Sequence, residues 1–186
     1  AIAFLVAQQD EAGWWPGASP GLWPREQRVG VTALALLALQ ADGSTLRKGP
    51  QLDAINRGLT YLREQQDPET GLIGDQIGHS FMYDHALATL AIVEAYGAER
   101  SPILKVMGQK ALQYICRARN PYGAWRYDVP PVGDNDTSIT FWCALALHAG
   151  ERARFKIDTS AFDGTLAWLD QVTDPNTGRT GYDSIG

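Results

Sequence analysis

The sequence predicts an all-α fold, an arc of an (α/α) toroid made of about three and a half helical hairpins. A recurring motif, an alternation of amphipathic and apolar helices, and glycine turns between them support this prediction. In the motif a helix ends in an aromatic–aliphatic pair, and a polar turn with a glycine follows. Its four copies start at Phe4, Tyr61, Tyr114 and Trp168, about 55 residues apart, a period typical of stacked supersecondary units.

The first helix of each predicted hairpin is amphipathic. Its apolar residues recur at helical spacing with polar residues on the other face, so one side meets protein and the other meets solvent. The apolar faces are Leu52, Ile55, Leu59 and Leu62 in the second copy and Ile103, Val106, Ala111, Tyr114 and Ile115 in the third. We expect these outer helices to end near Ala7, Glu64, Ala118 and Val172.

The second helix of each hairpin is apolar nearly all round, over residues 31–39, 86–93 and 139–147. A helix without a polar face must be enclosed on most sides, so these helices are predicted to form an inner layer. Glycines follow them in the sequence and suit left-handed C-terminal caps. These glycines are Gly43, Gly97 and Gly150.

The chain of 186 residues is long enough for one well-buried core, and we expect a single domain over 1–186. Its repeats are predicted over 1–49, 50–101, 102–157 and, incomplete, 158–186. The last repeat lacks an inner helix, so the arc is expected to have open apolar edges. We therefore expect either a fragment of a longer protein or edges covered by a protein partner or by self-association.

Charge and composition exclude several classes of function. The net charge of −5, without any basic stripe, argues against nucleic-acid binding. No apolar run reaches about 18 residues, so no transmembrane segment is expected. The two cysteines, Cys116 and Cys143, form no disulfide framework and leave the compartment open.

The loop residues carry a resemblance to a known superfamily. They are Gln9, Gly13 and Trp14 in the first copy, Gln66 and Gly71 in the second, Gly123 and Trp125 in the third, and Gly178 in the fourth. This pattern resembles the degenerate QW motif of the squalene–hopene cyclase and protein prenyltransferase superfamily, with Arg119 where a Gln is expected. Residues 83–90 and 133–138 look like the bacterial prenyltransferase/squalene oxidase repeat family, whose members often lack an assigned activity. The resemblance implies the toroid fold and not a reaction.

These loops also have a physical role that needs no family. A Gln at a helix end bonds backbone groups left unpaired there, and the Trp covers the turn. Residues 67–71 and 174–178 share one turn sequence pattern, in which Asp bonds the turn backbone, Pro presets φ and Gly supplies a positive φ. We expect turns here and not cation sites.

The strongest candidate for chemistry is the segment 134–138, which precedes the third inner helix. It resembles the Asp-x-Asp-Asp-Thr segment of class II terpene cyclases, whose middle Asp protonates the substrate. Alignment on Asp136 and Thr137 places Asn135 at that acid, and an amide is no comparable proton donor. Alignment on Asp134 and Asp136 instead places Thr137 at the final Asp, so the set of acids is incomplete in either register. We therefore expect Asp136, Thr137 or Ser138 to cap the helix instead.

The zinc ligands of protein prenyltransferases, an Asp, a Cys and a His, have no counterpart pattern here. Cys143 and His148 lie five residues apart, on different sides of one helix. The Gly-Cys-Gly-Glu-Gln segment of the thioester branch is also absent. We expect no metal, no cofactor and no catalytic residue in this chain.

A second cluster lies at the start of the second inner helix, where an Asp–His pair stands next to a tyrosine. Inner-helix N-termini approach the centre of a toroid, so these side chains are candidates to line a cavity. The candidate cavity-lining residues are Tyr83, Asp84, His85, Asp134, Asp136 and Trp142. His85 has an alternative role, in which it satisfies a neighbouring backbone group. The loop over residues 16–24 is a candidate rim for binding.

The favoured function is a non-catalytic toroid module that binds a partner protein, a peptide or an apolar ligand. The alternative is a cyclase-like or prenyltransferase-like enzyme whose catalytic residues lie outside this chain. A carbohydrate-active toroid is a third possibility, although no carboxylate pair is identifiable. The sequence leaves the ligand, the localisation and the oligomeric state open.

Overall fold

The computed structural model describes residues 1–17, 27–121 and 123–186. Within these ranges the protein has seven helices and no strand, so the all-α prediction is confirmed. The predicted outer helices are α1 (Ile2–Ala7), α3 (Leu52–Glu64), α5 (Pro102–Arg117) and α7 (Ser160–Val172), and the inner ones are α2 (Arg28–Ala41), α4 (Phe81–Glu99) and α6 (Thr137–Arg152). None of the described helices is both long and apolar enough to cross a membrane. Most of the predicted rim loop, including Trp23, lies outside the described residues.

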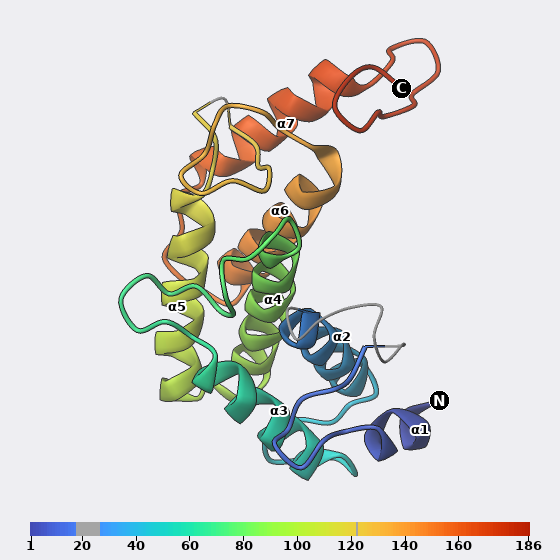
Figure 1. Ribbon diagram of the computed structural model, residues 1–186, viewed down its shortest axis with the longest axis vertical. Coiled ribbons are helices and arrows are strands. Elements are labelled where there is room, and N and C mark those ends of the chain that lie inside the picture. Colours follow the sequence, from blue (N-terminus) through green and yellow to red (C-terminus); the bar gives the residue numbers. More distant parts are fainter. Residues whose placement is uncertain (18–26, 122) are drawn as a thin grey trace.

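The three inner helices pack in chain order, with α4 between α2 and α6. Because α4 is flanked on both sides, it is buried along most of its length, which explains its apolar composition. Figure 1 shows α1 and α3 at one end of the molecule and α7 with the C-terminal segment at the other. In the segment 34–39, Ala35, Leu36 and Leu39 are buried as predicted, whereas Leu34 is 48% exposed.

The outer helices pack on the inner ones: α3 on α2, α5 on both α4 and α6, and α7 on α6. In α3 the predicted apolar face is largely buried. In α5 the prediction was wrong for Ile103 and Val106, which are 55% and 58% exposed. Leu104 and Met107 are buried instead, because they lie on the same helical face as Ala111.

Two of the three predicted helix caps are also wrong. Gly43 has a φ of 91° and ends α2 as expected. Gly97 and Gly150 instead lie inside α4 and α6, and left-handed conformations occur at Arg100 (φ 53°) and Arg154 (φ 65°). Gly150 is needed for close packing, because a Cβ there would lie 2.8 Å from Leu112 of α5.

Each of the first three glycine loops lies directly against the next outer helix. Gly13, Gly71 and Gly123 all have positive φ. A Cβ at Gly71 would lie 2.6 Å from the carbonyl oxygen of Lys110 in α5, and one at Gly123 would lie 2.5 Å from the Cα of Gly164 in α7. Gly13 meets the backbone of Arg57 in α3 in the same way. Only glycine satisfies both the conformation and the close approach.

The glutamine of each loop bonds across to the same helix. The Gln9 amide donates to the carbonyl oxygens of Gly13 and Ala54, both at 3.0 Å. Gln66 donates to the Met107 carbonyl at 3.1 Å and also to that of its own loop glycine. Each glutamine was expected to bond unpaired backbone groups at the end of its own helix. The prediction was wrong in this respect, because both amides bond the loop glycine and the next outer helix.

The third copy differs from the first two at the glutamine position, and the fourth copy differs in what its loop glycine contacts. Arg119 replaces the glutamine and reaches the start of α7, where its guanidinium bonds Asp158 at 3.2 Å and Ser160 at 3.0 Å. The connection to the next outer helix is kept, with a different side chain. In the fourth copy, within the described residues, a Cβ at Gly178 would meet nothing within 4 Å. The last loop therefore has no outer helix of the described chain to lie against.

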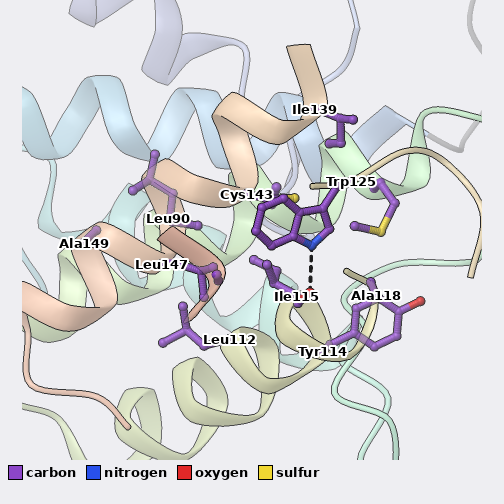
Figure 2. Close-up of a cluster of buried hydrophobic side chains, with 14 of the residues drawn as sticks. Leu90, Leu112, Tyr114, Ile115, Ala118, Trp125, Ile139, Cys143, Leu147 and Ala149 are labelled. Atoms are coloured by element: carbon purple, nitrogen blue, oxygen red, sulfur yellow. Dashed lines mark hydrogen bonds between the residues drawn. The ribbon is translucent and has the colours of Figure 1, made fainter. Parts of the chain in front are cut away.

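The loop tryptophan is a buried link between helix and loop. Trp125 is fully buried, its indole N–H donates to the Ile115 carbonyl at 2.8 Å, and its backbone N–H donates to Thr140 at 3.1 Å. Figure 2 shows this indole among the buried side chains of α5 and α6. In the first copy the equivalent residue is Trp15 and not the predicted Trp14, because Trp15 makes the corresponding bonds to Leu5 and Thr32.

The half-buried Trp14 instead lies under the guanidinium of Arg28, which is 3.9 Å from the centroid of the Trp14 ring.

The predicted turns at 67–71 and 174–178 are confirmed. Asp67 accepts the backbone N–H of Thr70 at 2.6 Å, and Asp174 accepts that of Asn176 at 2.7 Å. Gly178 has the predicted positive φ of 71°.

We expect Gly123→Ala to lower the free energy of unfolding by about 2–5 kcal/mol, because it adds a steric clash with α7 to an unfavourable φ. Gly43→Ala is the matched control. Gly43 has a similar φ but no atom within 4 Å of its added Cβ among the described residues, so its cost should be about 1 kcal/mol. Urea denaturation measures both. Equal losses would show that the close approach to α7 does not stabilise the fold.

Candidate functional site

Four of the six candidate residues lie at the N-terminal ends of two adjacent inner helices. Tyr83, Asp84 and His85 occupy the first turns of α4, and Asp136 is the residue that precedes α6. Since α4 and α6 pack side by side, these ends come together. The Tyr83 hydroxyl bonds the Ser138 hydroxyl, which donates to Asp136 at 2.7 Å. The structure therefore connects Tyr83 and Asp136 as one polar cluster.

Asp136 caps α6, as predicted. Its Oδ1 accepts the backbone N–H of Ile139 at 3.0 Å, and its Oδ2 accepts the hydroxyls of Tyr182, at 2.6 Å, and Tyr127. Burial alone would raise the pKa of Asp136, but the hydrogen bonds to the carboxylate outweigh burial and lower this pKa. Asp136 is therefore held as a carboxylate and not as a proton donor.

Tyr127 and Tyr182 were missed from the sequence. Burial, together with the hydrogen bonds to Asp136, Tyr182 and Tyr83, raises the pKa of Tyr127, so its phenol remains a donor. The sequence does contain a signal for both. Each tyrosine comes the same number of residues after its loop glycine, Gly123 or Gly178, and directly precedes an aspartate.

The three tyrosines line a pocket of about 590 Å³. His79 stacks on the Tyr127 ring at a centroid distance of 5.0 Å. The Arg126 guanidinium lies 5.6 Å from the Tyr127 ring centroid and 6.0 Å from that of Tyr182. The pocket thus presents aromatic rings and hydroxyls, together with Arg126 and Asp128, and the Asp136 carboxylate beside it already accepts hydroxyl and amide donors.

His85, expected to line a cavity, is fully buried in the core. Its Nδ1 accepts the backbone N–H of Ile73 at 3.0 Å, and its Nε2 bonds the Ala111 carbonyl at 3.1 Å. It takes the repeat position of Thr32 and Thr140, and so satisfies the loop backbone as they do. This is the alternative role considered for it.

The other three candidates lie apart from the tyrosine pocket. Asp84 is buried, and its carboxylate lies so close to Gly30 that a Cβ added to Gly30 would clash with it. Asp134 is exposed and lines a neighbouring polar pocket with Trp168. Trp142 is half-buried and packs edge-on against Phe141, with ring centroids 5.3 Å apart. The six candidates do not line one cavity.

The possible metal ligands are also dispersed. Among the described residues, no three His, Cys, Asp or Glu side chains lie close enough together to hold a metal ion. Cys143 is buried, whereas His148 on the same helix is exposed, in agreement with their predicted placement on different sides. Both cysteines are free thiols, and burial raises the pKa of Cys143 well above its usual value.

A second candidate surface is formed by α6 and α7. Phe141 of α6 is 57% exposed, and Leu166 of α7 is 61% exposed. The two helices meet where His148 lies against Phe162, with ring centroids 6.5 Å apart. The residues Phe141, His148, Phe162 and Leu166 therefore form one surface, which we call the α6–α7 edge.

The positions of this edge are covered in the preceding hairpin. In the repeat alignment Phe141 corresponds to Ala86, and Leu166 corresponds to Leu112. Ala86 and Leu112 are fully buried in the core that α6 completes, and Leu112 packs against Gly150 of α6. The last hairpin thus exposes positions that an inner helix covers in the hairpin before it.

Comparisons with known proteins place no further constraint on the site. No known protein family matches the chain, and no curated protein matches it. The functional assignment therefore rests on the residues and their geometry.

His85 should make the fold sensitive to acid. Burial, which outweighs the bond to Ala111, lowers its pKa from 6.5 to about 4. Above pH 6.5 the ring is neutral in both states, and as the pH falls from 6.5 to 4 only the unfolded chain gains the proton. We expect a loss of about 3 kcal/mol in the free energy of unfolding across this interval.

Urea denaturation between pH 7 and pH 4 measures this loss. His85→Gln should remove the His85 share of the pH dependence, whereas His148→Gln, at an exposed position, should leave it unchanged. An equal pH dependence in wild type and His85→Gln would contradict the assignment.

Proposed function

We propose that this chain is an arc of an (α/α) toroid of the terpenoid cyclase and protein prenyltransferase type. In this proposal it acts as a non-catalytic module that binds another polypeptide through the α6–α7 edge. The observation that carries the proposal is the exposure of Phe141 and Leu166 at positions whose counterparts, Ala86 and Leu112, are fully buried. A partner that presents an apolar helix, as α6 does to α5, would cover them.

The repeated loop contacts support the toroid. Each of the first three glycine loops lies against the outer helix that follows it, at Arg57, Lys110 and Gly164. A constant step between successive hairpins rotates the chain about one axis, as in other repeat folds. Inner helices that pack in chain order, each with an outer helix against it, also fit such an arc.

The state of Asp136 and Asn135 supports a non-catalytic role. Protonation of an alkene or epoxide needs a neutral carboxylic acid, and the pKa of Asp136 is lowered by its hydroxyl and amide donors, which outweigh its burial. Asn135, at the other candidate position, accepts the Asn120 amide at 2.7 Å. The rival function, a cyclase-like or transferase-like enzyme, would need its acid or zinc ligands outside this chain.

Sedimentation equilibrium tests whether the edge associates. Exposed apolar surface of this kind lowers solubility and favours association, so we expect the purified chain to self-associate as its concentration rises. The double variant F141S/L166S should remain monomeric, because it replaces the apolar centre of the edge. I103S/V106S is the matched control, since it removes equally exposed residues from the outer surface of α5.

A chain that is monomeric at all concentrations and as stable as its F141S/L166S variant would overturn the proposal. Equal loss of association in F141S/L166S and I103S/V106S would also overturn it, because association would then follow general hydrophobicity and not this edge.

A further inference from the structure

We infer that a pocket at the C-terminal ends of α2 and α4 binds a small amphiphilic cation, an apolar molecule that carries an ammonium group. The pocket has a volume of about 410 Å³, within the range of ligand sites. Leu37, Leu90 and Leu145 line it, one from each inner helix. It does not include the residues of the α6–α7 edge, so the inference goes beyond the proposed function.

The polar side chains of Gln40 and Thr45 on the pocket wall are held by contacts within the protein. The Gln40 amide nitrogen donates to the Ala91 carbonyl at 3.1 Å, while its Oε1 is buried and has no partner among the described residues. The Thr45 hydroxyl already donates to Glu99 at 2.5 Å. Because Oε1 is buried away from the free space of the pocket, neither Gln40 nor Thr45 selects a ligand, and the carboxylate of Glu94 is left as the group that can.

The local charge favours a cation. Glu94, an exposed residue, contributes a carboxylate to the pocket wall, and the ion pairs found among the described residues do not involve it. α2 ends at Ala41 and α4 ends at Glu99, so the partial negative charges of two helix C-termini lie nearby. None of the described residues on the pocket wall is a lysine or an arginine.

The shape and charge together define the ligand. Its apolar body packs against the three leucines, and its ammonium group lies by the exposed carboxylate of Glu94. Neither a carboxylate nor a neutral alcohol with the same apolar body would match the charge.

Isothermal titration calorimetry at pH 7 with n-octylammonium, n-octanol and n-octanoate tests the inference. We expect octylammonium to bind at least about threefold more tightly than octanoate, the ratio that an exposed ion pair provides. Glu94→Gln should weaken octylammonium binding about threefold and leave octanol binding unchanged. Glu64→Gln, an exposed carboxylate at the end of α3, is the matched control and should change neither.

Ala98→Phe should abolish binding of all three compounds, because the phenyl ring fills the pocket. If this variant does not fold, the comparison of Glu94→Gln with Glu64→Gln decides whether the carboxylate on the pocket wall binds the ammonium group. The F141S/L166S variant should bind octylammonium like the wild type, so failure of this inference and failure of the proposed function are distinguishable. Equal binding of octanoate and octylammonium, an unchanged affinity in Glu94→Gln, or no binding by the folded wild type would overturn the inference.

Discussion

The structure depends on the contact between each glycine loop and the outer helix that follows it. At Gly71 and Gly123 the loop backbone comes so close to α5 and α7 that no side chain fits between them. The amides of Gln9 and Gln66 fasten the same interface by bonding carbonyl oxygens inside the next helix. Each hairpin is therefore stabilised by its successor, and the last one has no successor among the described residues. This explains why the apolar α6–α7 edge is exposed.

Much of this fold could be predicted from the sequence, because the helical hairpins repeat their own pattern. The ends of α3 and α7 and the cap at Asp136 agree with the prediction. What failed depends on contacts between hairpins. Gly150 looks like a helix end in the sequence, but Leu112 of another helix needs the space beside it.

The candidate site was harder to predict, because adjacent residues on α4 face different surroundings. Tyr83 joins the polar cluster with Asp136, whereas His85, two residues later, replaces a repeat threonine in the core. Tyr182 approaches Asp136 from the far end of the chain, and helical periodicity carries no information about such a contact. Only its shared spacing with Tyr127 from a loop glycine pointed to it.

Hydrogen–deuterium exchange along the chain tests the central claim most directly, since it reports the local free energy of opening at each amide. If each hairpin is stabilised by its successor, amides of α7 and of the loop at Gly178 should exchange much faster than those of α5 and of the loop at Gly123. Equal protection of α5 and α7 would contradict the account, because the contact with a following hairpin would then make no difference to stability.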